Sequence, residues 1–286
     1  MGLLLIVVSQ VVHLVEGMLT RTCSKKHGDG GLIFNSLISF FSMIFFVVSD
    51  RNGFYFPKEL WVYGLVSGLC YAGGFYYMFR ALQIGSFGMT RLLSSFGLII
   101  TIFYGLLFLQ EPAGYFTYIG IFLILISIFF TNMGKITKED RKMGSGKWLI
   151  CVIASILCNG GIGILSRMQQ IHFNEKCDNE FLIISLAISF ILMGVLGLIK
   201  DRSRLKEIFK NSIWYSFGAG TANGLNNLLR MITYLYIPMS VMAPLSSGIG
   251  IVLGFVVSIL LYREKFTKLQ FAGVIIGIAA VVLLKL

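Results

Sequence analysis

The chain has 286 residues, of which 56% are hydrophobic and only 13% are charged, and its mean hydropathy is +0.83. A soluble globular domain carries about 25% charged residues because its surface must be hydrated, so this composition excludes a soluble domain and predicts an integral membrane protein. Lysine and arginine (24) outnumber aspartate and glutamate (13), which gives a net charge of +11.

Ten mostly apolar runs, each long enough to cross a bilayer as an α-helix, follow one another along the chain. They cover residues 3–20, 31–49, 60–81, 87–109, 114–132, 147–166, 181–199, 213–235, 240–262 and 268–286. The first run has no basic leader and no small-residue cleavage signature, so we expect it to remain as a membrane span rather than to be removed as a signal peptide. The sequence therefore predicts an all-α integral membrane protein with ten transmembrane helices.

The basic residues concentrate in the breaks after the odd-numbered runs. These breaks hold Arg21, Lys25, Lys26, the clusters 135–147 and 200–210, and Arg263, Lys265 and Lys268, whereas the opposite side holds Arg51, Lys58, Arg167, Lys176 and Lys285. Because cytoplasmic loops carry the excess of lysine and arginine, both termini are predicted to lie outside the cytoplasm. The positive charge is therefore a topology signal, and no nucleic-acid partner is expected.

The longest break, residues 133–146, divides the ten runs five and five. We expect it to be a cytoplasmic linker between two five-helix units, residues 1–132 and 147–286. Internal similarity at a shift of 152 or 153 residues supports this division, since Leu93-Ser94-Ser95 aligns with Leu245-Ser246-Ser247, and Gln110-Glu111-Pro112 with Arg263-Glu264-Lys265. An odd number of spans per copy makes the second copy enter the membrane from the opposite side. The two copies are therefore predicted to form an inverted repeat, which is typical of secondary transporters.

The first run carries a polar stripe on an otherwise apolar helix. Gln10, His13 and Glu16 are three residues apart and Thr20 follows four residues later, which places all four on one helix face. A charged side chain inside the bilayer needs a partner or a watery cavity, so we expect this face to point into the bundle. Glu16, with His13 beside it, is a candidate for proton coupling and for substrate binding. The alternative is that Glu16 pairs with an arginine and only holds helices together.

The eighth run carries a second and more polar stripe. Asn223, Asn226, Asn227 and Arg230 recur at i, i+3, i+4 and i+7. Amides offer both donors and acceptors and a guanidinium offers a planar fork, so this face can bind a carboxylate or several hydroxyls. We predict that these side chains line a substrate cavity together with the aromatic rings of Tyr71 and Tyr77 in the third run. The alternative is that the asparagines only join helices and that Arg230 reaches outward to the membrane interface.

Other residue types point to no further chemistry. The five cysteines form no Cys-x-x-Cys pair, so neither a disulfide framework nor a metal site is expected. The chain contains no Gly-x-x-x-x-Gly-Lys-Ser/Thr sequence for nucleotide binding and no visible nucleophile with an acid/base pair. We therefore expect neither an enzyme nor a bound cofactor, and the energy for transport must come from a gradient or from a partner chain.

Each half contains a helix that carries Leu-Ser-Ser, then a glycine, and ends at a glutamate two or three residues after a leucine, followed by one last apolar span; Glu111 and Glu264 stand at matching places and Pro244 lies early in the ninth run. In these features the chain resembles the EamA-type branch of the drug/metabolite transporter superfamily. The resemblance implies a ten-helix, two-repeat carrier for small metabolites or drugs, commonly an exporter, driven by a proton or other gradient. The first span lacks the tryptophan often found there in this family, and its Glu16 is similar to the membrane-embedded first-helix glutamate of the small multidrug resistance transporters.

The leading hypothesis is a multi-pass plasma-membrane protein that exports a small polar or zwitterionic metabolite, such as an amino acid, by alternating access coupled to protons. In this hypothesis Arg230 takes a carboxylate and Glu16 takes an amine. The expected partners are a small-molecule substrate, membrane lipid and a coupling proton, and the expected state is a monomer or a homodimer. One alternative is proton-coupled export of hydrophobic cations, and another is a lipid-intermediate flippase or a subunit of a larger membrane complex.

Overall fold

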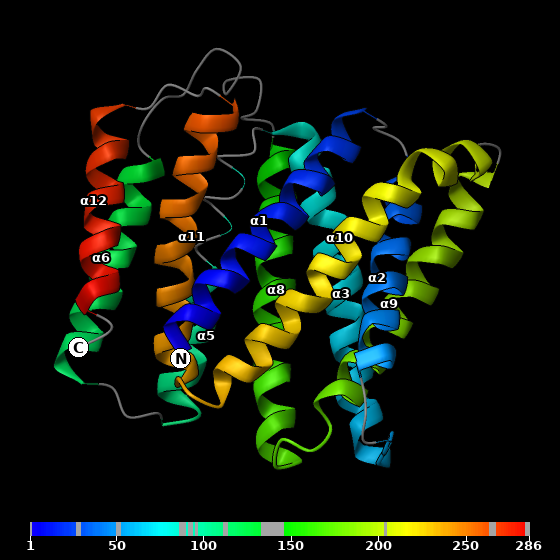
Figure 1. The fold of residues 1–286 in the computed structure, drawn as a ribbon, viewed down its shortest axis with the longest axis horizontal. Helices are drawn as coiled ribbons and strands as arrows, with labels where there is room; N and C mark the ends of the chain where they lie inside the picture. Colours follow the sequence, from blue (N-terminus) through cyan, green and yellow to red (C-terminus); the bar gives the residue numbers. More distant parts are fainter. Residues whose placement is uncertain are drawn as a thin grey trace.

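The computed structural model describes residues 2–26, 30–49, 53–85, 90, 94, 97–110, 114–132, 146–202, 205–262 and 267–283. Within these ranges the secondary structure is entirely helical (Figure 1). The helices are α1 (Gly2–Lys26), α2 (Gly31–Ser49), α3 (Lys58–Ile84), α5 (Leu98–Leu107), α6 (Tyr115–Asn132), α8 (Gly146–His172), α9 (Asp178–Lys200), α10 (Leu205–Tyr234), α11 (Met239–Tyr262) and α12 (Lys268–Leu283).

Each helix lies on one of the ten predicted runs, so the all-α class is confirmed for the described residues. The bounds of α2 coincide with the predicted run 31–49. In contrast, α10 begins at Leu205 rather than at 213, because Lys206, Glu207 and Lys210 are good helix formers that continue the helix beyond its apolar part. Residues 133–145 of the predicted linker and most of the fourth run before Gly97 lie outside the described residues.

Several helices are long and apolar enough to cross a membrane. In the part of the chain that the structure describes, five combine the required length and hydropathy, namely α1, α2, α8, α9 and residues Ser240–Val257 of α11. Shorter apolar segments occur at Tyr118–Ser127 in α6 and Lys268–Ala280 in α12. These helices identify a multi-pass membrane protein, while the number of ten spans stays a prediction.

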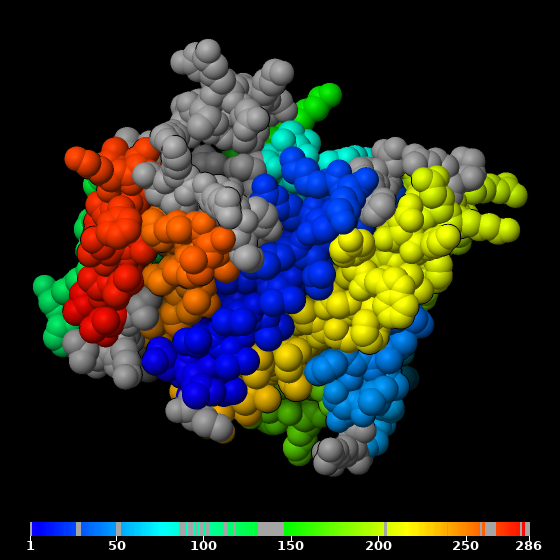
Figure 2. All heavy atoms as spheres, turned by 45° about the horizontal axis from the view of Figure 1, so that its top comes forward, coloured from blue at the N-terminus to red at the C-terminus, as the bar shows by residue number. Residues whose placement is uncertain are grey.

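Helices of the first half pack mainly against helices of the second half. α1 packs with α10 and α11, α2 with α9 and α10, α3 with α8 and α9, α5 with α11 and α8, and α6 with α12. Figure 2 shows α1 lying across one face of the molecule between α10 and α11. Hydroxyl groups join several of these pairs: Ser39 Oγ and Ser189 Oγ are 2.9 Å apart between α2 and α9, and Ser127 Oγ donates to the Gly273 carbonyl at 2.6 Å between α6 and α12.

The contact between α2 and α10 is close because α10 has a glycine there. A Cβ atom on Gly220 would lie 2.8 Å from the Ile38 carbonyl oxygen and 2.7 Å from Phe41 Cβ. This approach lets Ser42 Oγ of α2 donate to the Gly220 carbonyl at 2.7 Å. The polar stripe of α10 is thereby held against α2, with α1 packed on the same helix.

Candidate functional site

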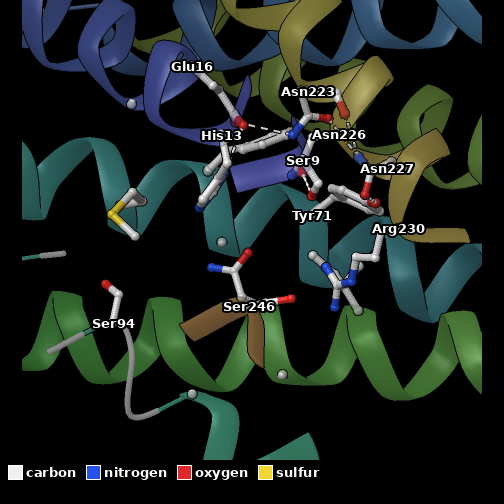
Figure 3. Close-up of a pocket in the computed structure, with 18 of the residues that line it drawn as sticks. Ser9, His13, Glu16, Tyr71, Ser94, Asn223, Asn226, Asn227, Arg230 and Ser246 are labelled. Carbon is white, nitrogen blue, oxygen red and sulfur yellow. Dashed lines mark hydrogen bonds and ion pairs between the residues drawn. The ribbon is translucent and has the colours of Figure 1, made fainter. Parts of the chain in front are cut away.

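A cavity of about 270 Å³ lies between α1, α2, α3, α8, α10 and α11, so both halves of the chain form its wall. Seven of the eight side chains selected from the sequence line it, as Figure 3 shows for His13, Glu16, Tyr71, Asn223, Asn226, Asn227 and Arg230. Gln10 and Thr20 of the first stripe also line it, and so do Ser94, Ser246 and Ser247. The structure therefore brings the two predicted polar stripes to one cavity.

The eighth selected residue, Tyr77, is not among the residues that line this cavity. The cavity face of α3 contains Tyr71, Phe75 and Met78, at the i, i+4 and i+7 spacing of one helix face. Because each residue turns an α-helix by about 100°, Tyr77 lies roughly 120° around α3 from Tyr71. Its ring packs against Tyr76 instead, with 5.5 Å between the ring centroids. The expectation that Tyr77 shares the cavity is thus corrected.

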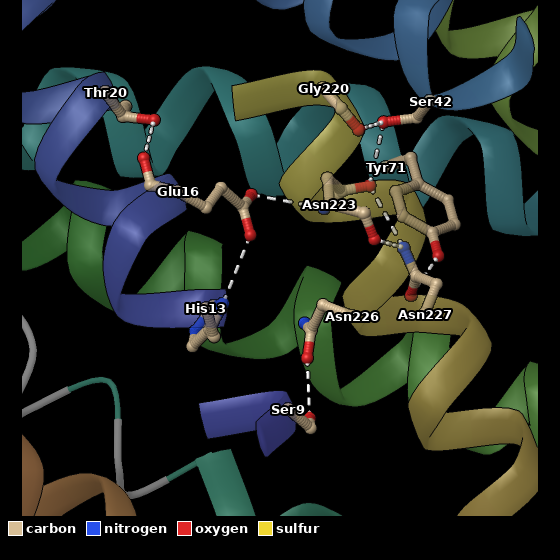
Figure 4. A network of polar contacts seen from close by, with 10 residues as sticks. All are labelled: Ser9, His13, Glu16, Thr20, Ser42, Tyr71, Gly220, Asn223, Asn226 and Asn227. Carbon is tan, nitrogen blue, oxygen red and sulfur yellow. Dashed lines mark hydrogen bonds and ion pairs between the residues drawn. The ribbon is translucent and has the colours of Figure 1, made fainter. Parts of the chain in front are cut away.

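Glu16 is held by neighbours on α1 and α10. The residue is only 8% exposed. Its Oε1 accepts a hydrogen bond from Asn223 Nδ2 at 3.1 Å, and its Oε2 lies 3.2 Å from His13 Nδ1 (Figure 4). The Thr20 hydroxyl donates to the Glu16 carbonyl at 2.9 Å. The carboxylate is therefore bonded by an amide and an imidazole, and no ion pair between Glu16 and an arginine is found among the described residues.

A row of hydrogen bonds leads from α3 across α10 to Glu16. The Tyr71 hydroxyl donates to Asn227 Oδ1 at 2.9 Å, and Asn227 Nδ2 donates to Asn223 Oδ1 at 3.0 Å. The same Asn223 oxygen accepts from Ser42 Oγ of α2 at 3.2 Å. In every hydrogen bond of the row the acceptor is the group nearer to Glu16. The row ends at Glu16, because an ionised carboxylate only accepts hydrogen bonds. The row therefore connects three helices to the charge state of one side chain.

Arg230 lies toward the other end of the cavity. Its Nε donates to the Tyr234 hydroxyl at 3.2 Å, and the ring of Tyr234 also has the Arg167 guanidinium 5.9 Å from its centroid. No carboxylate pairs with Arg230 in the part of the chain that is described. From Asn223, which bonds Glu16, to Arg230 is about 10 Å along α10 at a rise of about 1.5 Å per residue. The cavity thus presents a carboxylate and a guanidinium that are bonded to different neighbours.

Some lining residues were missed by the sequence reasoning. Asn35 and Asn159 are single amides in apolar runs, and Tyr234 ends the helix that carries the polar stripe. Asn159 Nδ2 donates to the carbonyl and to the hydroxyl of Ser155, at 2.7 and 3.1 Å. Treating every amide within a membrane span as a candidate would have found the two asparagines, because a polar group in lipid must face the protein interior.

The described residues of the cavity wall offer charge and hydrogen bonding to a ligand. No group of three or more His, Cys, Asp or Glu side chains that could hold a metal ion occurs within the described ranges. Among the described residues, the cavity wall combines amides and hydroxyls with the carboxylate of Glu16, the imidazole of His13 and the guanidinium of Arg230. Such a wall can bind a small molecule that carries hydroxyls, a carboxylate or an amine.

Comparisons with known proteins identify the family and the fold. The chain matches the model of the EamA-like transporter family over residues 1–133 and 146–286. It is 22% identical over 285 residues to a curated protein of Lactiplantibacillus plantarum named "Putative sugar uptake protein", covering 97% of this chain and 94% of that protein. It also resembles a solved crystal structure with a TM-score of 0.68 and 12% identity, covering 100% of this chain and 98% of that chain. The last likeness concerns the fold alone.

Proposed function

Because this chain belongs to the EamA-like transporter family, we propose that it is a secondary active transporter that moves a small polar or zwitterionic metabolite, such as an amino acid, across the plasma membrane by alternating access. Family membership points to a transporter rather than an enzyme, embedded in a membrane and acting on a small molecule. The substrate class, the coupling proton and the direction, for which the family resemblance favours export, belong to the proposal.

The proposed architecture is a pair of inverted five-helix repeats. In this arrangement α1, α2, α3, α5 and α6 of the first half correspond, in that order, to α8, α9, α10, α11 and α12 of the second half. The contact of α1 with α10 then has its counterpart in the contact of α8 with α3. Likewise, the contact of α2 with α10 has its counterpart in the contact of α9 with α3. The direction of the helices supports inversion, because α2 runs parallel to α10, with Ile38 beside Gly220 and Ser42 beside Asn223. Since α3 follows α2 in the opposite direction, α10 is inverted relative to its counterpart α3 (Figure 1). A cavity between two such halves is where alternating access operates.

The observation that carries the substrate assignment is the pair of opposite charges in one cavity: among the described residues Glu16 pairs with no arginine or lysine, and Arg230 pairs with no carboxylate. Two charge-assisted hydrogen bonds of about 2.8 Å and the separation of about 3 Å between the amine and a carboxylate oxygen of an α-amino acid add up to about 9 Å. The backbone positions of Asn223 and Arg230 are about 10 Å apart along α10, which is of the same order as this length. We therefore assign the substrate carboxylate to Arg230 and the amine to the carboxylate of Glu16, while Asn226 and Asn227 contact the molecule between them.

Glu16, with His13 beside it, is the proposed site of the coupling proton. Glu16 Oε1 and Asn223 Nδ2 are 3.1 Å apart. A proton on this oxygen removes the acceptor of the hydrogen bond that Asn223 donates. Protonation therefore weakens the bond between α1 and α10, and through Asn223 and Asn227 it also affects the bond to Tyr71 on α3. A proton and a substrate amine compete for the same carboxylate, and this competition produces exchange.

A second candidate is transport of a sugar. The name of the Lactiplantibacillus plantarum relative and the amides and hydroxyls of the cavity wall favour it, since such groups bind hydroxyls through both donors and acceptors. In this case Arg230 and Glu16 bind hydroxyl groups, and the direction is uptake, as in the name of that relative.

The proposal is tested with the purified protein in liposomes. Amino acids, sugars and hydrophobic cations are first screened by thermal stabilisation, and the hits are then followed by flux in both directions under an imposed pH gradient. We expect amino acids to stabilise the protein and to accumulate against their own gradient. Flux of sugars alone would support the second candidate, and flux of hydrophobic cations alone would support drug export. Movement of lipid alone would support a flippase.

Proton coupling is tested by Glu16→Gln. Glutamine cannot bind or release a proton at the pH values of the imposed gradient. We therefore expect this variant to bind substrate but to lose accumulation driven by the pH gradient. Glu180→Gln is the matched control, since Glu180 is also buried but accepts from the Tyr55 backbone amide at 2.8 Å, away from the cavity. Accumulation driven by the pH gradient that persists in Glu16→Gln would remove Glu16 from the coupling mechanism.

A further inference from the structure

We propose that Asn35 on α2 determines the substrate specificity of this cavity by donating a hydrogen bond from its side-chain amide to an uncharged oxygen of the substrate. This inference rests on the proposed function, because it takes the cavity between Glu16 and Arg230 as the substrate site. It adds a feature that the two charges do not supply: the substrate carries a neutral amide, carbonyl or hydroxyl oxygen at a distance from its amine.

The first observation is a buried donor without an acceptor. Asn35 is 1% exposed and belongs to the residues that line the cavity. Its Nδ2 is buried and has no hydrogen-bond partner among the described residues. Buried polar groups are paired in the great majority of cases, and one that stays unpaired lowers stability. An unpaired amide in the wall of a cavity therefore indicates an acceptor that arrives with the ligand.

The second observation is the position of Asn35 along the cavity. α2 and α10 run side by side, with Ser216 Oγ donating to the Phe34 carbonyl at 3.3 Å and Ser42 Oγ donating to Asn223 at 3.2 Å. Asn35 therefore lies about 10 Å along α2 from Ser42, on the side of Asn223 that is away from Arg230. A substrate held at Glu16 and Arg230 reaches Asn35 only with a group that extends past Glu16. This geometry favours a side chain of about the length of glutamine.

The third observation is an apolar cluster formed by Phe34, the residue that precedes Asn35 on α2. Phe34 packs with Ile38, Phe79, Cys23 and Ala219, and the rings of Phe34 and Phe79 are 5.4 Å apart. A second carboxylate placed beside this cluster would be desolvated without a counter-charge, which is far more costly than burial of a neutral group. An ammonium group would face a donor instead of an acceptor. The group that fits is a neutral oxygen.

The binding test uses ligands that differ mainly in that oxygen. Glutamine is compared with methionine, asparagine with leucine, and a hexose with its deoxy analogue, in the wild type and in Asn35→Leu. A ligand with a hydrocarbon in place of the neutral oxygen leaves the amide donor of Asn35 unpaired. This corresponds to a roughly 5- to 150-fold loss of affinity relative to the ligand with the oxygen. We expect the wild type to prefer the oxygen-bearing member of a pair by such a factor, and Asn35→Leu to lose that preference while binding the other member as before. A preference that survives in Asn35→Leu overturns the inference.

A second measurement needs no ligand. Leucine is close to asparagine in size and removes the unpaired donor, so Asn35→Leu without ligand should melt no lower than the wild type. Asn159→Leu is the matched control in the same cavity wall, and it should melt lower because it removes two bonds to Ser155. An Asn35→Leu variant that melts as low as Asn159→Leu contradicts the inference, since its amide then has a partner in the protein. Failure of the proposed function is distinct, because in that case no amino acid of either pair binds to the wild type.

Discussion

The hydroxyl group of Tyr71 is the point at which α3 joins the row of side chains that ends at Glu16. Tyr71→Phe removes the donor to Asn227 Oδ1 and leaves a buried acceptor unpaired, so we expect it to lower the stability by about 1–3 kcal/mol. Tyr77→Phe is the control on the same helix, because no hydrogen bond of the Tyr77 hydroxyl is found in the described part of the chain and the residue lies off the cavity. Thermal melting of both variants distinguishes them.

The same hydroxyl should be coupled energetically to Glu16. Residues in one hydrogen-bond network show interaction energies of about 0.5–3 kcal/mol in double-mutant cycles. We expect Tyr71→Phe and Glu16→Gln to be non-additive in stability, whereas Tyr77→Phe and Glu16→Gln should be additive. Additive changes in stability for the first pair would show that Tyr71 on α3 and Glu16 on α1 are not energetically coupled through the row of hydrogen bonds.

Much of the candidate site could be predicted from the sequence, for a physical reason. Polar side chains at helical spacing in an apolar helix must point away from lipid, which places Glu16 and Asn223 inside the bundle. Their partners could not be predicted, because they depend on which helices meet: Ser9 donates to Asn226, 217 positions away. Tyr77 was placed wrongly because only the packing of α3 selects the face that carries Tyr71.

At the scale of single elements, the contact between α2 and α10 depends on the missing side chain of Gly220. Gly220→Ala places a Cβ at 2.8 Å from the Ile38 carbonyl oxygen, so the two backbones must move apart. We expect a loss of about 1–3 kcal/mol of stability and weaker transport, because Ser42 and Asn223 separate as well. Gly254→Ala on α11 is the control, since among the described residues no atom outside its own stretch of helix lies within 4 Å of the added Cβ. Equal melting temperatures of the two variants would contradict this view of the contact.

The apolar runs of the sequence predicted where the helices lie, but they predicted the ends of the helices less accurately. α2 coincides with its run, whereas α10 extends to Leu205 through charged residues that are good helix formers although they are not apolar. α10 is also absent from the five described helices that satisfy the criteria of a membrane span. Its amides and Arg230 lower its hydropathy, so composition alone identifies poorly the helix that supplies the more polar stripe of the cavity wall.

At the scale of the whole molecule, the orientation in the membrane stays a prediction. Figure 1 shows the start of α1, the end of α12 and the end of α8 toward one edge, and the end of α9 and the start of α10 toward the opposite edge. With five native cysteines replaced, Lys176→Cys and Arg202→Cys provide one exposed label on each side. We expect an impermeant maleimide added outside cells to label Lys176→Cys alone, because the excess of basic residues marks the cytoplasmic side. Labelling of Arg202→Cys alone would reverse the orientation and leave the fold intact.

In the proposed mechanism the substrate carboxylate binds Arg230 in the cavity between the two halves. The direct measurement compares thermal stabilisation by an amino acid and by its carboxamide in the wild type, in Arg230→Gln and in Arg167→Gln. Arg167 is the control, because it also lies against Tyr234 but does not line the cavity. A hydrogen bond to a charged group contributes about 1.5–3 kcal/mol, so we expect the wild type and Arg167→Gln to prefer the carboxylate by roughly 10- to 150-fold, and Arg230→Gln to show no preference. A preference of the same size in Arg230→Gln would contradict the account.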